Sequence, residues 1–106
     1  MILLKPTVRF KRLRPEIYNT FPILEEIWLE HAEGAELVIT SANDSTHSSK
    51  SLHYHDLALD LRSKNVTTPI KLKLLEAMKA RLAGFDVILE AFGKENEHFH
   101  LEYDPK

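Results

Sequence analysis

Residues 85–103, FDVILEAFGKENEHFHLEY, decide the fold that we predict for this sequence. Two runs rich in aliphatic and aromatic residues stand on either side of a short polar stretch that contains Gly93. Runs of this length and composition, bounded by glycine and polar residues, are typical of β-strands. We therefore predict one strand over Phe85–Phe92 and another over His98–Tyr103.

The segment before this stretch predicts a helix. Residues Lys71–Leu82 carry apolar side chains at three- and four-residue intervals, and Gly84 follows as a stop signal. We expect the apolar side of this helix to consist of Leu72, Leu75, Met78 and Leu82. The same periodicity over Pro15–Glu33 indicates an earlier helical region, which Pro22 divides into a short and a longer helix.

Two further strands complete the predicted sheet. Short aliphatic runs predict them over Glu36–Thr40 and Leu57–Leu61, and the polar loop Ser41–Ser51 lies between. The order is then helices, two strands, a helix and two strands. This order favours an α+β fold, with a small, mainly antiparallel sheet and flanking helices, in one domain that spans residues 1–106.

The composition excludes several classes of protein. The apolar fraction of 43% and the charged fraction of 28% are ordinary for a globular domain, which disfavours disorder. With 14 basic and 16 acidic residues, the chain has no bulk attraction to nucleic acid or anionic lipid, so we expect neither as a partner. No segment has the pattern of a signal peptide or a membrane span, so we expect the protein to be cytoplasmic as synthesised. We also expect it to be a monomer.

The histidines concentrate where we expect the chemistry. Five of the six lie in two short windows, 47–55 and 98–100. Because residues i and i+2 of a strand project from the same face, His98 and His100 are expected to face one cleft. The chain has no cysteine, so any metal site must be built from histidines and carboxylates.

These residues include the parts of a catalytic zinc site. A catalytic zinc has three protein ligands and one position open to water, and His53, Asp60 and His100 can supply the three ligands. A further carboxylate must take a proton from the attacking water and pass it to the leaving amine. We expect Glu97, three residues before His100, to be this general base.

The spacing of these residues resembles a known family. The segment Ser51–Asp60, SLHYHDLALD, resembles the pattern S-x-H-x-x-G-x-A-x-D of the zinc D-Ala-D-Ala carboxypeptidases, and Glu97-His-Phe-His100 resembles the second half of their signature. That family includes phage L-alanyl-D-glutamate endopeptidases and shares its fold with hedgehog signalling domains. The resemblance covers roughly residues 35–103. It implies that His53, Asp60 and His100 bind one Zn²⁺ and that Glu97 is the base.

Two departures from the family pattern bear on the substrate. Asp56 stands where the family has glycine, and Ala42-Asn43-Asp44 stands where the family often has an arginine that holds a substrate carboxylate. Without that arginine, cleavage at a terminal D-Ala is disfavoured and cleavage at an internal bond is favoured. Arg62 is another cation near the motif, but no sequence pattern places it.

The resemblance implies a zinc peptidase that hydrolyses peptidoglycan stem peptides. We favour an endopeptidase of the phage-lysin kind, which cuts the L-alanyl-D-glutamate bond and acts on the cell wall once released. One alternative is a D-Ala-D-Ala carboxypeptidase, a dipeptidase or another hedgehog-fold peptidase. A second is a non-catalytic zinc-binding or virion structural domain. His98 remains open between a hydrogen-bond donor in the transition state, a partner of a ligand and a surface residue, and the roles of His47 and His55 are open too.

The predicted ligand set has a direct test. We expect the purified protein to contain about one zinc ion per chain, and His53→Ala, Asp60→Ala and His100→Ala should each abolish stoichiometric binding. Elemental analysis after dialysis measures the content. Any of these variants that retains full occupancy would remove its residue from the ligand set.

Overall fold

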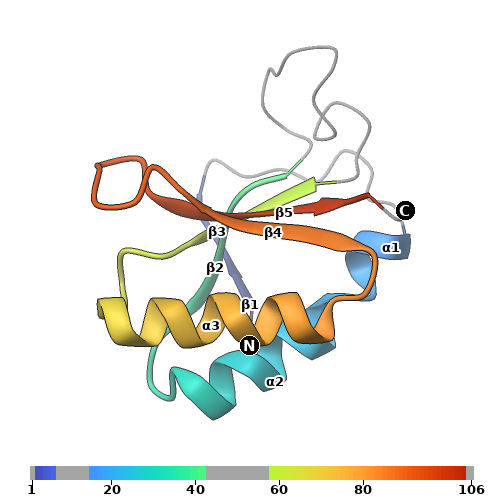
Figure 1. Cartoon of the computed structure of the whole chain (residues 1–106), viewed down its shortest axis with the longest axis horizontal. Coiled ribbons are helices and arrows are strands. Elements are labelled where there is room, and N and C mark those ends of the chain that lie inside the picture. Colours follow the sequence, from blue (N-terminus) through green and yellow to red (C-terminus); the bar gives the residue numbers. More distant parts are fainter. Residues whose placement is uncertain (1, 7–14, 43–57, 105–106) are drawn as a thin grey trace.

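A five-stranded sheet with helices on one face forms the frame of the protein (Figure 1). The computed structural model describes residues 2–6, 15–42 and 58–104. The elements are, in chain order, β1 (Ile2–Leu4), α1 (Pro15–Tyr18), α2 (Phe21–His31), β2 (Leu37–Ser41), β3 (Ala58–Arg62), α3 (Thr68–Arg81), β4 (Phe85–Glu90) and β5 (His98–Tyr103).

The sheet is mixed, with strand order β1-β2-β3-β5-β4. β1 pairs with β2 in parallel, and the other three strand pairs are antiparallel. The α+β class with flanking helices is confirmed, but the prediction missed β1 and its parallel pairing. At three residues, β1 is too short for its own alternation pattern to reveal it.

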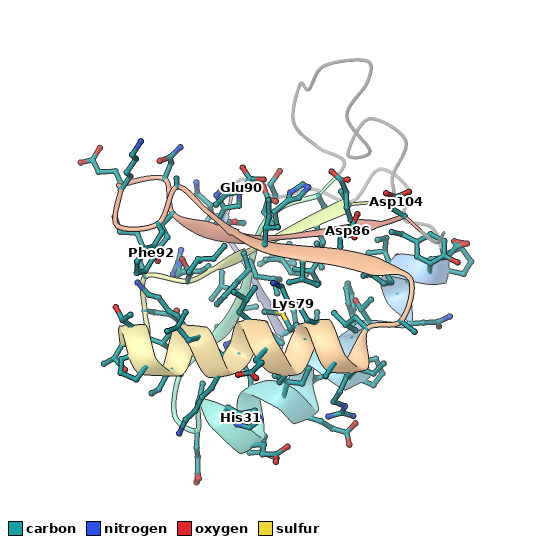
Figure 2. All side chains as sticks on the ribbon, viewed as in Figure 1. His31, Lys79, Asp86, Glu90, Phe92 and Asp104 are labelled. Atoms are coloured by element: carbon teal, nitrogen blue, oxygen red, sulfur yellow. The ribbon has the colours of Figure 1, made fainter. Side chains whose placement is uncertain are left out.

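The strand register places polar side chains on one face of the sheet and the core residues on the other. Across β3, β5 and β4, Asp60 stands opposite His100, and His100 stands opposite Ile88. The next residue along β3, Leu61, and the residue before His100 on β5, Phe99, are fully buried in the core. Figure 2 shows Glu90 on the other side of the sheet, away from α3. Because side chains alternate along a strand, the polar residues of β3 and β5 share this outer face.

Helix α3 covers the inner face of β4. It begins after Thr67, whose backbone is extended, with Pro69 in its first turn. Gly84, with φ of +83°, turns the chain from α3 into β4, a conformation that glycine adopts without steric cost. Contrary to our prediction, Leu72 is 51% exposed, and Leu74 is the residue that packs inward.

The buried stripe of α3 is narrower than we predicted. Leu74, Met78 and Leu82 are spaced four residues apart and are all buried, while Leu75 is partly buried against the core. Residues four apart lie on the same side of a helix, so these three side chains face the sheet and Leu72 faces solvent. No helix in the described ranges is long and apolar enough to cross a bilayer.

One buried ion pair fastens the β4–β5 connection to the helical layer. The Glu97 side chain is only 1% exposed, and its Oε1 lies 2.7 Å from Nζ of Lys71 in α3. Ser63 Oγ donates a hydrogen bond to the same oxygen (2.6 Å), and the Gly93 N–H donates to Oε2 (2.9 Å). Burial raises the pKa of Glu97, but these hydrogen bonds and the Lys71 charge outweigh burial and lower the pKa to about 2. The carboxylate is therefore charged at neutral pH and joins three segments of the chain.

This ion pair predicts the stability of a variant. Glu97→Gln should lower the free energy of unfolding by about 3 kcal/mol, because it leaves the Lys71 ammonium without a counter-charge. Urea unfolding at neutral pH measures the change. Glu95→Gln, at an exposed position two residues earlier, is the matched control, with an expected change below about 0.5 kcal/mol. Equal effects of the two substitutions would contradict a structural role for Glu97.

The pH dependence of the same variant follows from the direction of the pKa shift. Folding lowers the Glu97 pKa from 4.5 to about 2. Its charged form therefore stabilises the fold fully above pH 4.5, and this stabilisation is lost as the pH falls toward 2. The difference in unfolding free energy between wild type and Glu97→Gln should narrow over this range.

Candidate metal centre

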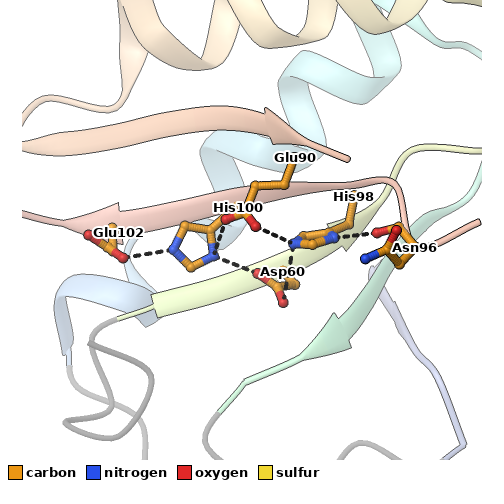
Figure 3. A network of polar contacts seen from close by, with 6 residues as sticks. All are labelled: Asp60, Glu90, Asn96, His98, His100 and Glu102. Carbon is orange, nitrogen blue, oxygen red and sulfur yellow. Dashed lines mark hydrogen bonds and ion pairs between the residues drawn. The ribbon is translucent and has the colours of Figure 1, made fainter. Parts of the chain in front are cut away.

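Three side chains on the outer face of the sheet could hold a metal ion. Asp60 of β3 and His98 and His100 of β5 each offer a ligand atom, and these atoms all lie within 4.8 Å of one another. Figure 3 shows both imidazole rings in contact with Asp60. The three side chains converge because the register sets Asp60 opposite His100, and His98 lies two residues earlier on the same face of β5.

His98 presents one ring nitrogen to the cluster and anchors the other. Its Nδ1 lies 2.7 Å from the Asn96 backbone oxygen. A carbonyl oxygen can only accept, so Nδ1 carries the hydrogen and donates it. In the neutral ring this leaves the lone pair on Nε2, which lies 3.7 Å from Asp60 Oδ2. His98 is therefore in the tautomer that a metal ligand requires.

His100 is held between two carboxylates. Its Nδ1 lies 2.8 Å from Asp60 Oδ1, and its Nε2 lies 2.8 Å from Glu102 Oε1. Burial lowers the pKa of His100, but the hydrogen bonds to Asp60 and Glu102, with the charges of Asp60 and Glu90, raise the pKa to about 9. In this structure the ring is therefore the cation that the carboxylates surround. The site is built to hold positive charge.

The donor set fits a divalent metal. Zinc held tetrahedrally at about 2.0–2.2 Å sets its ligand atoms about 3.3 Å apart. The contacts of Asp60 with His100 (2.8 Å) and with His98 (3.7 Å) bracket that spacing. With a metal on His100 Nδ1, the Nε2–H would still donate to Glu102, an arrangement that orients ligating histidines in many metal sites. Two imidazoles and one carboxylate suit zinc and other divalent transition metals such as Fe²⁺.

Glu90 is a carboxylate beside the cluster that the sequence analysis did not select. Its two oxygens lie 3.7 Å from His98 Nε2 and 3.8 Å from His100 Nδ1. The side chain is 42% exposed, so the carboxylate remains accessible to solvent. Glu90 stands opposite His98 in the β4–β5 register, and only this cross-strand pairing could have revealed it.

The predicted site residues have different outcomes. Asp60 and His100 are brought together, and His98 joins them with a nitrogen suited to ligation. Glu97 lines a pocket beside the cluster but is not part of the converging group, because its carboxylate is buried in an ion pair with Lys71. The structure therefore gives no support to Glu97 as the base. His53 falls outside the described residues, as do His47, His55 and Asp56.

Two pockets flank the cluster. A pocket of about 540 Å³ is lined by Glu90, His100, Glu102 and neighbouring residues of β4. A second, of about 320 Å³, shares Asp60 and His98 with the cluster and is also lined by Lys5, Arg62 and Lys64. The group Asp60, His98 and His100 thus lies between two pockets.

No protein-family model and no curated protein matches the sequence. The likeness to the zinc D-Ala-D-Ala carboxypeptidase family therefore rests on the two half-motifs alone. The structure adds one independent observation, which is that Asp60, His98 and His100 lie close enough together to hold a metal ion.

The contact between Glu102 and His100 leads to a prediction about metal affinity. Glu102→Ala should weaken metal binding by about 10-fold or more, because it removes the acceptor that orients the His100 ring. Competition with a chromophoric chelator measures the dissociation constant. Asp86→Ala is the matched control, because Asp86 stands opposite Glu102 on β4 and carries the same charge. If both variants bind metal equally weakly, general charge rather than the hydrogen bond is responsible.

Proposed function

We propose that this chain is a zinc-dependent peptidase with a hedgehog-type fold, and that it hydrolyses an amide bond in peptidoglycan stem peptides. The observation that supports the proposal most is the convergence of Asp60, His98 and His100 within 4.8 Å, at two of the positions that the family motif selects. A zinc ion held there would polarise the scissile carbonyl and lower the pKa of a water molecule to about 7.

Glu90 is the residue that we assign as the general base. Its carboxylate lies within 3.8 Å of both imidazoles, yet it is not one of the three converging ligands. From there it can take a proton from the attacking water and deliver it to the leaving amine. Glu97 is less suited to this step, because Lys71, Ser63 and Gly93 already occupy both of its oxygens.

The L-alanyl-D-glutamate bond remains the favoured cleavage site. Terminal D-Ala release is the second candidate, and the observation that favours it is Arg62. This arginine lines the pocket that shares Asp60 and His98 with the cluster, so a cation does lie beside the site. Mass spectrometry of digested sacculi separates the two reactions. An endopeptidase leaves a new N-terminal D-glutamyl fragment, and a carboxypeptidase releases free D-alanine.

The peptidase proposal is tested with purified sacculi and zinc-loaded protein. We expect hydrolysis that a chelator abolishes and that added zinc restores. Zinc binding without hydrolysis of sacculi or model peptides would instead favour the non-catalytic domain. Loss of zinc from Asp60→Ala and His98→Ala, measured in parallel, tests the ligand set independently of turnover.

The identity of the base is tested by two matched substitutions. Glu90→Gln should retain zinc and lower turnover by about 10²–10⁴-fold, because it removes the proton acceptor but preserves size. Glu97→Gln, assayed where it remains folded by circular dichroism, should retain both zinc and most turnover. The reverse result would assign the base role to Glu97, as the family motif implies.

A further inference from the structure

Arg62 has an exposed side chain next to the group Asp60, His98 and His100. It lies two residues after Asp60 on the same face of β3 and stands opposite His98 in the β3–β5 register. Within the described ranges its side chain has no hydrogen bond and no ion pair. A planar guanidinium without a partner is well suited to bind a carboxylate through two parallel hydrogen bonds.

Two lysines share the pocket with Arg62. Lys5 follows β1, where its backbone N–H donates to Ile39 O (2.9 Å) and fixes the start of its side chain beside β2. Lys64 Nζ donates to the Glu95 backbone oxygen (3.1 Å), which holds that ammonium at the rim. We call the pocket that these two lysines and Arg62 line the basic pocket.

The acidic groups of the basic pocket are largely neutralised. Glu97 is paired with Lys71, and Asp60 is hydrogen-bonded to His100. Glu95 is the remaining carboxylate among the lining residues, and it is exposed at the rim. Ser41 Oγ is buried and finds no hydrogen-bond partner in the described part of the chain, which leaves a further donor in the lining.

The pocket on the other side of the cluster has the opposite charge. Three carboxylates, Asp86, Glu90 and Glu102, line it, together with Lys79 and the His100 ring that Glu102 already binds. A carboxylate entering there would be repelled, whereas in the basic pocket it would be attracted. The two pockets therefore fix the direction in which an anionic substrate can lie across the metal ligands.

We propose that the basic pocket binds an α-carboxylate of the substrate, carried by the residue next to the scissile bond, with Arg62 as its main partner. The proposal rests on the peptidase function proposed above and names the chemistry that the peptidase selects. A terminal D-Ala carries such a carboxylate. So does a D-glutamyl residue that continues the chain through its γ-carboxyl, because its α-carboxylate stays free. An internal bond of this kind therefore also presents an anion to the site.

Binding is tested first, apart from turnover. The probes are N-acetyl-L-alanyl-D-glutamine, which has a free α-carboxylate, and its C-terminal carboxamide, which is neutral at that position. They are titrated by NMR into zinc-loaded Glu90→Gln protein, so that neither peptide is consumed. We expect the acid to bind about 10-fold more tightly than the amide, because of its charge-assisted hydrogen bonds. Equal affinities would overturn the proposal.

The partner of the carboxylate is identified by two arginine substitutions in the same protein. Arg62→Gln should abolish the preference for the acid and leave zinc content unchanged. Arg81→Gln is the matched control, because Arg81 pairs with Glu26 at the helical surface and should leave the preference intact. A preference that survives Arg62→Gln would place the carboxylate elsewhere, for instance on the metal, and would overturn the proposal.

Hydrolysis by the wild-type protein then separates this proposal from the peptidase function. Preferential binding of the acid without cleavage would support the basic pocket and reject the peptidase. Equal cleavage of acid and amide would support the peptidase and reject the pocket. N-acetyl-D-alanyl-D-alanine and its carboxamide, run in parallel, show whether the terminal or the γ-linked residue is the better source of the carboxylate.

Discussion

The antiparallel register that sets Asp60 opposite His100 decides where every neighbouring side chain lies. Because side chains alternate along a strand, this one pairing places Leu61 and Phe99 in the core and leaves Asp60, His98 and His100 together outside. A slip of one residue would bury the charged groups and expose the apolar ones. The cost of burying three ionisable side chains therefore helps to hold this register.

The periodicity of apolar residues was enough to predict most of the helices and strands. The strand His98–Tyr103 has the bounds that we predicted, and the helix before Gly84 differs by three residues at its start. Both segments are periodic over several residues, so their patterns carry the information. β1 was missed because its stability comes from pairing with β2, more than thirty residues later, and three residues show no usable alternation.

The candidate site was partly predictable for the same reason. Asp60 and His100 follow from their spacing within the motifs, and the shared face of His98 and His100 follows from strand alternation. Glu90 could not be found in this way, because its place depends on the β4–β5 register, which a single sequence does not reveal. The placement of Glu97 outside the converging group was not predicted. Glu97 lies an odd number of residues before His100, so continuing the strand alternation would have placed it on the inner face.

The long separation in sequence between the two residues of this contact, Asp60 and His100, has a consequence for how the chain folds. Asp60 and His100 are 40 residues apart, and all of α3 and β4 lies between them. A contact between residues so far apart in sequence carries a loop-closure cost, which the native packing of α3 and β4 must offset. A metal that binds the native state alone shifts the folding equilibrium by mass action, by about 2.7 kcal/mol at a hundredfold excess over its dissociation constant. An ion bound there would link β3 to β5 without a covalent bond, and the metal concentration would then contribute to the stability of the fold.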